Sequence, residues 1–293
     1  MLFDPEITIF LRDLIPWAGE VLGFISEVGD LLFYVGVILI AYWTFGKREA
    51  ILTSVVMTVS LFSNYWLKYA IANPRPPNTP PNNYWYEGVE ATNFSTPSGH
   101  AHNSATFYGW ISAKVKTWWM LFVSIIVVLL IGFSRVYLGV HYLGDVLLGW
   151  GIGIVTVLVI FQIERPFTSF ASQYKSEYLW LALSAFAFLL VLISSFLPYP
   201  PADNFGAYGG LVMGLGVAVP LEQKYVGFET GSAIKVTHMA VRVVVGLVLV
   251  LGLMLGLSGL LPTTQIWLRT LRYFLVVLVG VFIWPLIFKK AGL

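Results

Sequence analysis

The sequence predicts an all-α protein, a polytopic transmembrane helical bundle of about nine spans. Of its 293 residues, 58% are hydrophobic and only 11% are charged, and the mean hydropathy is +0.80. The apolar residues also fall into long segments rich in Leu, Val and Ile, and most of these approach the ~20 residues that a helix needs to cross a bilayer. Because an open sheet would leave backbone groups unpaired in lipid, we expect the segments to be helices.

An amphipathic helix is expected before the spans. Residues 3–19 place Phe3, Phe10 and Leu14 at helical spacing, with acidic residues on the other side, so this helix should lie at the outer interface. The segments from 98 and from 207 are short, glycine-bearing and partly polar, and we expect them to be tilted or partly buried in the bundle. The predicted spans are 28–45, 50–71, 98–114, 117–138, 142–163, 177–197, 207–222, 237–257 and 266–288.

The basic residues predict the orientation. Connections rich in Lys and Arg are expected on the cytoplasmic side, whereas the stretches 198–206 and 258–265 contain neither residue. We therefore expect the N-terminus outside and the C-terminus inside, and the first residues lack the pattern of a cleaved signal peptide. The basic residues on alternate connections are Lys47, Arg48, Lys114, Lys116, Arg165, Lys175, Lys224, Lys235, Lys289 and Lys290.

Charge and cysteine content exclude several classes of function. The net charge of +2 is too small to indicate a nucleic-acid partner. The absence of cysteine excludes disulfides, thiol chemistry and any metal held by cysteine.

Three short strings concentrate the polar chemistry of this apolar chain. Lys68 is followed by Arg75-Pro76, residues 97–100 read Pro-Ser-Gly-His, and a third string runs from Ser134-Arg135 through His141 to Asp145. Ionisable groups at bilayer depth are costly unless paired or hydrated, so each indicates a function. The predicted topology brings all three strings to the outer face of the membrane.

The residue types indicate a site for a phosphate group. Lys68, Arg75 and Arg135 supply positive charge, and an arginine fork suits two phosphate oxygens at once. Ser98 adds a hydroxyl donor. Gly99 allows its backbone N–H to approach an oxygen closely at the start of a helix. Snorkelling of the cations at the membrane edge is the structural alternative.

The histidines predict two-step hydrolysis. His141 and Asp145 are four residues apart, so on a helix they share one face and the carboxylate can accept from one imidazole nitrogen. The other nitrogen is then free to attack phosphorus. His100 is available as the acid for the leaving group and later as the base for water. A structural ion pair of His141 with Asp145 is the alternative.

These strings resemble the type 2 phosphatidic acid phosphatase family, whose pattern is K-x6-R-P, P-S-G-H and S-R-x5-H-x3-D. The resemblance covers about residues 30–163 and implies dephosphorylation of lipid phosphates or diphosphates without metal or cofactor. It implies phosphate contacts from Lys68, Arg75, Ser98, Gly99, His100 and Arg135, with His141 as nucleophile and Asp145 as its partner.

Residues 1–163 are accordingly predicted to form the catalytic core with the interfacial helix, and residues 164–293 to form additional transmembrane helices packed on it. The extension is expected to be a wall of a lipid-access groove or the surface of a homodimer. Its glycines predict close helix packing; they are Gly206, Gly209, Gly210, Gly214, Gly216, Gly246, Gly252 and Gly256.

The expected partners are membrane lipids and a lipid phosphate substrate. Candidates are phosphatidic acid, phosphatidylglycerol phosphate, a polyprenyl or dolichyl phosphate or diphosphate, and a sphingoid phosphate. Two alternatives are a vanadate-dependent haloperoxidase, which uses the same residues, and a non-catalytic lipid-binding protein. A transporter is disfavoured because the charged groups lie at one face rather than at the midplane. The aromatic residues Tyr84, Trp85 and Tyr86 are expected to form an interfacial belt or a lid.

Overall fold

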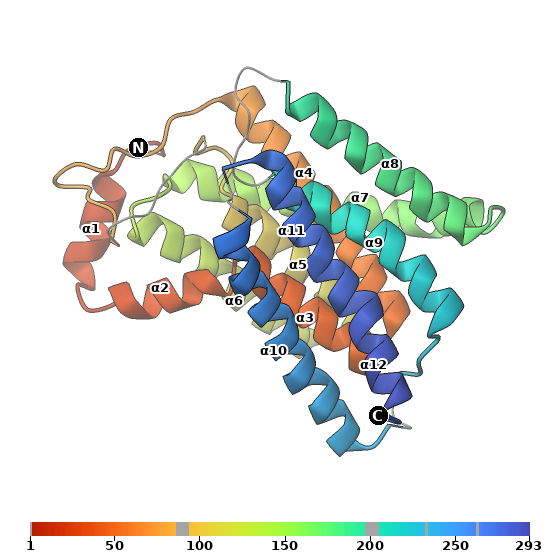
Figure 1. The fold of residues 1–293 in the computed structure, drawn as a ribbon. Helices are drawn as coiled ribbons and strands as arrows, with labels where there is room; N and C mark the ends of the chain where they lie inside the picture. The colour runs from red at the N-terminus through yellow and green to blue at the C-terminus, as the bar shows by residue number, and fades with distance from the viewer. Residues whose placement is uncertain (1, 86–93, 197–204, 232–233, 262–263) are drawn as a thin grey trace. The chain divides into compact units, whose positions relative to one another are not determined.

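The computed structural model describes residues 2–85, 94–196, 205–231, 234–261 and 264–293, and these residues form helices and connections without strands. Figure 1 shows the order of the helices along the chain. The helices are α1 (Glu6–Leu14), α2 (Gly19–Glu27), α3 (Leu31–Thr44), α4 (Lys47–Ile71), α5 (Gly99–Val115), α6 (Trp118–Tyr137), α7 (Leu143–Ala171), α8 (Ser176–Ser194), α9 (Phe205–Tyr225), α10 (Val236–Leu260), α11 (Ile266–Leu278) and α12 (Trp284–Lys290), with a π-helical turn, η1 (Val279–Ile283), between the last two. The predicted all-α class is confirmed for this part of the chain.

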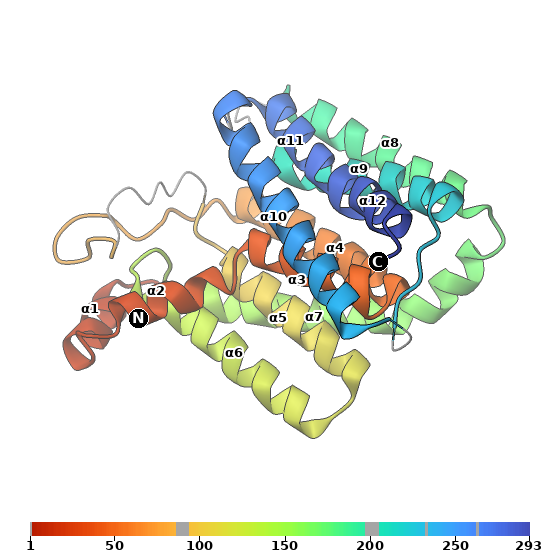
Figure 2. The ribbon, with the colours of Figure 1, turned by 60° about the horizontal axis from the view of Figure 1, so that its bottom comes forward.

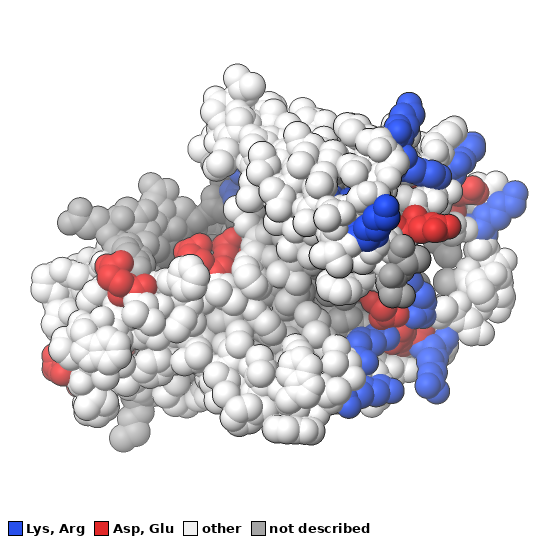
Figure 3. Space-filling model, turned by 90° about the horizontal axis from the view of Figure 1, so that it is seen from below, with Lys and Arg blue, Asp and Glu red and all other residues white. Residues whose placement is uncertain are grey.

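The predicted count of about nine spans is too high. Among the described residues, seven helices are long and apolar enough to cross a membrane, or eight if α2 and α3, bent by 49°, count as one span. The α3 helix has only 14 residues, and α5 has 17 residues with several buried polar side chains. Much of the face in Figure 3 is uncharged, and side chains such as Ile154 and Leu158 are more than half exposed. The chain is a multi-pass integral membrane protein.

The helix predicted over residues 3–19 is shorter in the structure. The α1 helix covers Glu6–Leu14, and a second helix, α2, begins at Gly19. The α1 helix packs on α6, where the Thr8 hydroxyl donates to Val136 O at 2.8 Å and Arg12 Nε donates to Tyr137 O at 2.8 Å. The α2 helix also packs on α6. The location of α1 at the membrane interface stays a prediction.

The chain forms two compact units. Residues 1–35 and 53–162 form the first, and residues 36–52 and 163–293 form the second. The predicted division of roles between the regions 1–163 and 164–293 stays a prediction.

In the first unit, α7 approaches the beginning of α5 very closely. A Cβ at Gly149 would lie 2.9 Å from the Ser98 carbonyl oxygen, and a Cβ at Gly153 would lie 2.6 Å from the His102 carbonyl oxygen. These two glycines therefore let the α7 backbone pack directly on the segment that contains the Pro-Ser-Gly-His string. Figure 2 shows α5 beside α6, with which it also packs.

In the second unit, α9 packs against both α8 and α11. A Cβ at Gly210 would lie 2.3 Å from the Thr270 carbonyl oxygen on α11, and one at Gly209 would lie 2.2 Å from Val191 Cγ2 on α8. Close packing was predicted for these glycines. The same prediction is wrong for Gly252 and Gly256, which have no described atom within 4 Å of a built Cβ, because they lie on an open face of α10.

The packing of α7 on α5 predicts the effect of an added methyl group. Gly153→Ala should destabilise the protein by about 1–3 kcal/mol, because the methyl group would overlap the α5 backbone. Gly151→Ala is the matched control on the same helix, since no described atom lies within 4 Å of its Cβ position. Thermal unfolding in detergent measures both variants. Equal melting temperatures for the two would contradict the close approach.

Candidate active site

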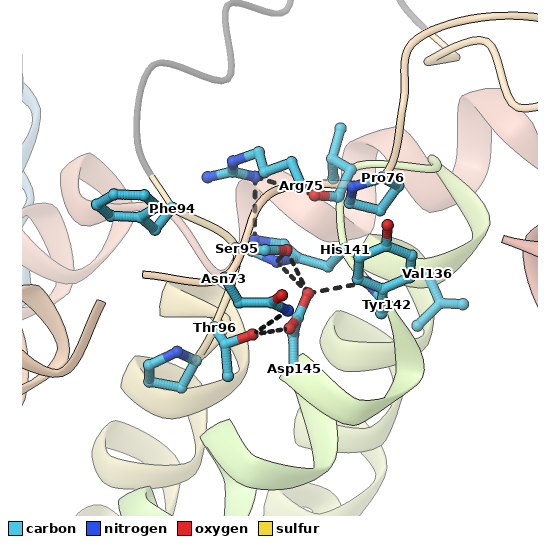
Figure 4. A network of polar contacts seen from close by, with 12 residues as sticks. Asn73, Arg75, Pro76, Phe94, Ser95, Thr96, Val136, His141, Tyr142 and Asp145 are labelled. Atoms are coloured by element: carbon cyan, nitrogen blue, oxygen red, sulfur yellow. Dashed lines mark hydrogen bonds and ion pairs between the residues drawn. The ribbon is translucent and has the colours of Figure 1, made fainter. Parts of the chain in front are cut away.

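The predicted site residues all lie in the first unit, and Figure 4 shows the polar contacts around Asp145. They come from several consecutive elements: Lys68 from the last turn of α4, Arg75 and Ser98 from the loop before α5, Gly99 and His100 from the first turn of α5, Arg135 from the last turn of α6, His141 from the turn before α7, and Asp145 from the first turn of α7. Most contacts within this network join two side chains, and a few join a side chain to the backbone.

Asp145 is fully buried and its carboxylate accepts four hydrogen bonds. One oxygen accepts from the Thr96 hydroxyl, while the other accepts from the Ser95 hydroxyl, from Tyr142 N at 2.9 Å and from His141 Nδ1 at 3.2 Å. A buried carboxylate needs such donors to replace its hydration. The network therefore supplies these donors and fixes the carboxylate beside His141.

His141 is oriented from both sides of its ring. Its Nδ1 lies 3.2 Å from Asp145 Oδ2 and 3.3 Å from Ser95 Oγ, and its Nε2 lies 3.3 Å from Arg75 Nη1. A proton on Nδ1, assigned from these contacts, leaves a lone pair on Nε2. The predicted pairing with Asp145 is present, but His141 lies in the turn before α7, which begins at Leu143, rather than on the helix itself.

The surroundings of His141 favour its neutral form. Burial, followed by the charges of Arg75, Lys68 and Arg135, lowers the pKa of His141 well below its ordinary value of 6.5. A neutral imidazole is the nucleophilic form. The ring is therefore ready for attack on phosphorus at neutral pH.

Neutral oxygens anchor the three predicted phosphate-binding cations. Lys68 Nζ donates to Phe94 O at 2.7 Å and to Ser95 O at 3.0 Å. Arg75 Nη1 donates to Val140 O at 3.0 Å, and Arg135 Nη1 donates to the Ser26 hydroxyl on α2. These hydrogen bonds fix the three cationic groups beside His141.

The Pro-Ser-Gly-His string forms the N-terminus of α5. Ser98 is the extended N-cap residue, its N–H donates to Asp145 O at 3.0 Å, and its buried hydroxyl has no partner among the described residues. The first N–H groups of a helix have no intrahelical acceptor and attract anions. Gly99 and His100 open this turn. The string thus presents a hydroxyl and backbone donors to the site.

The sequence-based prediction missed Ser95, Thr96 and Asn73. Asn73 Nδ2 donates to Thr96 Oγ1 at 2.8 Å, so this amide orients one of the two hydroxyls bonded to Asp145. The signal in the sequence that could have indicated Ser95 and Thr96 is their position, because they directly precede the Pro-Ser-Gly-His string that begins at Pro97. Two adjacent hydroxyl residues in a loop have too many ordinary roles to indicate a carboxylate partner by themselves.

The aromatic residues beside the loop are packed against the site. The Tyr84 hydroxyl donates to Pro76 O at 2.9 Å, and the Trp85 ring lies 5.6 Å from that of Tyr137. Tyr86 lies outside the described residues. Within the described ranges, no three His, Asp or Glu side chains are grouped as ligands for a metal ion.

Comparisons with known proteins agree with the pattern of the three strings. The family model "PAP2 superfamily" matches residues 49–169, and the model "PAP2 superfamily phosphatase, transmembrane extension" matches residues 206–293. Phosphatidylglycerophosphatase B of Bacillus subtilis is 31% identical over 176 residues, which cover 55% of this chain and 81% of the relative. Lipid phosphate phosphatase delta of Arabidopsis thaliana is 23% identical over 223 residues, 71% of this chain and 53% of the relative.

One solved structure is also similar. It is the crystal structure of the first transmembrane PAP2 type phosphatidylglycerolphosphate phosphatase from Bacillus subtilis, with 29% sequence identity and a TM-score of 0.47. The match covers 55% of this chain and 85% of that chain.

From its contacts with Asp145 and His141, we expect the Ser95 hydroxyl to contribute measurably to the rate of phosphate release. Ser95→Ala removes a donor shared by Asp145 and His141, and the loss of a hydrogen bond to a charged group should lower the rate about 10–100-fold. Ser104→Ala is the control, because this buried hydroxyl donates only to Ala101 O on its own helix. An unchanged rate for Ser95→Ala, or equal losses for both variants, would contradict the assignment.

The lowered pKa of His141 predicts the pH at which its ring takes up a proton. NMR of labelled histidine in the detergent-solubilised protein, assigned by difference with His141→Asn, should place its midpoint below pH 6.5. Replacing Arg75 by Met removes a nearby positive charge and should raise that midpoint. The unfolded chain binds this proton near pH 6.5 and the native protein does not, so this group lowers stability as the pH falls below 6.5. A midpoint above 6.5 would contradict the interpretation.

Proposed function

The chain belongs to the PAP2 superfamily of membrane phosphatases, and we propose that it hydrolyses a lipid phosphate monoester or diphosphate through a phosphohistidine at His141. The observation that carries the proposal is the position of His141. Its Nδ1 faces the buried carboxylate of Asp145, and its Nε2 faces Arg75. The nucleophilic nitrogen therefore lies where a cation can hold a phosphate oxygen.

In the first step, the lone pair of His141 Nε2 forms a bond to phosphorus as the ester P–O bond breaks. His100 acts in its protonated form, which the negative charge of the bound phosphate favours, and donates that proton to the leaving alkoxide, or to the leaving phosphate of a diphosphate. Lys68, Arg75 and Arg135, together with Ser98 and the N–H of Gly99, stabilise the charge on the non-bridging oxygens. The Asp145 carboxylate stabilises the imidazolium character that develops on His141.

In the second step, His100 takes a proton from a water molecule whose oxygen attacks phosphorus. The N–P bond breaks and its electron pair returns to Nε2, so inorganic phosphate leaves and both histidines recover their starting states. No metal or cofactor takes part in this scheme.

The names of the relatives support a lipid substrate. They indicate phosphatidylglycerol phosphate for the Bacillus protein and a lipid phosphate for the Arabidopsis protein. We propose a lipid phosphate or diphosphate as the broad class, with glycerolipid, isoprenoid and sphingoid phosphates as the candidates. The haloperoxidase alternative would need vanadate-dependent halide oxidation, and the non-catalytic alternative does not explain why the described site retains all three strings.

We also propose that the site lies on the extracytoplasmic face. The support is the distribution of Lys and Arg outside the site, which marks the opposite ends of the helices as cytoplasmic. Lys114 and Lys116, for example, lie at the end of α5 away from His100. A dimer through the second unit remains a prediction.

The first test is phosphate release from a lipid phosphate in detergent with excess EDTA. Purified protein should remain active, since three cations replace the divalent metal that many phosphatases use, and orthovanadate should inhibit it. Loss of activity on chelation that magnesium or zinc restores would overturn the metal-independent mechanism.

Variants of the two histidines separate the proposed roles of nucleophile and proton donor, and each variant is the control for the other. His141→Ala should abolish both turnover and phosphoenzyme, whereas His100→Ala should lose about 2–5 kcal/mol of transition-state stabilisation. An aryl phosphate needs little proton donation, so it should partly rescue His100→Ala alone. Rescue of His141→Ala, or phosphohistidine trapped on His100, would exchange the two roles.

The orientation predicts the labelling of introduced cysteines in a chain that has none of its own. A cysteine at Thr79 should react with an impermeant thiol reagent applied from outside intact cells. A cysteine at Lys114 should react only after permeabilisation. The reverse labelling pattern would invert the topology.

A further inference from the structure

A cavity of about 190 Å³ lies beside His100 and Arg135, and α2 with the turn after it forms one wall. Ser26, Glu27 and Asp30 line this wall, and Trp85 lines the cavity from the loop before α5. The volume is smaller than the 300–1,000 Å³ typical of pockets for drug-sized ligands. It suits the first atoms of a substrate next to the phosphate rather than a whole lipid chain.

The α2 wall is in direct contact with the catalytic groups. Ser26 Oγ accepts a hydrogen bond from Arg135 Nη1. A Cβ at Gly29 would lie 3.1 Å from His100 Cδ2 and 2.7 Å from Ile131 Cγ2, so the turn after α2 packs on the His100 ring. The match to the PAP2 family model begins at residue 49, whereas α2 ends at Glu27. This wall therefore precedes the residues that the family model matches.

The proposed function places a particular part of the substrate in this cavity. His100 protonates the leaving oxygen, so the atoms bonded to that oxygen lie next to the His100 ring. The cavity adjoins His100 and Arg135 and is therefore the space for the leaving group. This step rests on the proposed function.

The charge of the wall selects among leaving groups. Glu27 and Asp30 contribute two carboxylates, and Asp30 uses one oxygen to accept from Leu32 N at 2.9 Å. A diphosphate would bring a second phosphate toward these carboxylates, and the leaving group of phosphatidylglycerol phosphate carries a phosphodiester. Both are repelled by like charge. The leaving group of phosphatidic acid is neutral and gains nothing from them.

We propose that the cavity is a subsite for a cationic leaving group. The favoured substrate is then a long-chain monophosphate with an ammonium group on the carbon next to the phosphoester carbon, as in sphingoid phosphates. The ammonium would donate charge-assisted hydrogen bonds to Glu27 and Asp30 while the phosphate binds Arg135, Arg75 and Lys68. The ammonium group of the substrate thus faces the carboxylates, and its phosphate group faces the cations.

The test compares lipids that differ at this position. Dihydrosphingosine 1-phosphate carries the ammonium, octadecyl phosphate has a chain of the same length without it, and phosphatidic acid represents the neutral glycerolipids. The wild-type protein should show a kcat/KM for dihydrosphingosine 1-phosphate at least about tenfold above that for octadecyl phosphate. Glu27→Gln should remove most of this difference by lowering kcat/KM for the ammonium lipid only.

Two further variants separate recognition from a structural role. Glu20→Gln changes an acidic residue on the same helix that does not line the cavity and should leave the preference unchanged. Asp30→Asn keeps an acceptor for the Leu32 N–H, so it preserves the cap of α3 while it removes charge. It should also reduce the preference.

Equal kcat/KM for the three lipids in the wild-type protein would overturn the subsite while leaving the phosphatase proposal intact. The same would follow if Glu27→Gln lowered kcat/KM equally for all of them, because the carboxylate would then only balance the charge of Arg135. If the protein hydrolysed none of these lipids and no isoprenoid diphosphate, the proposed function and this inference would both be overturned.

Discussion

A single buried carboxylate, that of Asp145, joins the segments that form the site. Removing a carboxylate from water costs several kcal/mol, and only well-placed donors compensate for that cost. Here two hydroxyls, one backbone N–H and one imidazole provide the donors. They come from the loop before α5 and from the turn between α6 and α7, while Asp145 itself lies in the first turn of α7. Folding that left Asp145 without these donors would be strongly disfavoured, so satisfying it also positions His141.

The cationic side chains of the site are also held by specific hydrogen bonds. Lys68 Nζ donates to two backbone carbonyls, and Arg135 Nη1 donates to the Ser26 hydroxyl. Hydrogen bonds of this kind fix charged groups in place before a substrate binds, as in preorganised sites. The positive charges of Arg75, Lys68 and Arg135 also help to lower the pKa of His141.

Close backbone packing and an added helix complete the first unit. Gly149 and Gly153 let α7, which carries Asp145, lie directly against the N-terminal turn of α5. The α2 helix then covers His100 and holds Arg135 through Ser26. The α2 helix precedes the residues that the family model matches, whereas His100, His141 and Asp145 lie within them.

The sequence by itself determined the all-α membrane class, the family and the participation of Lys68, Arg75, Ser98, His100, Arg135, His141 and Asp145 in one region. Hydropathy and local spacing are enough for these, since they depend on residue type and on neighbours along the chain. Tertiary structure decided the rest. Whether a segment such as α5 spans depends on its length and on partners for its buried polar groups. The role of Ser95 and Thr96 arises from contact with Asp145, some 50 residues away. The wall that Glu27 and Asp30 form beside His100 likewise depends on packing of α2 on α6, which no local pattern encodes.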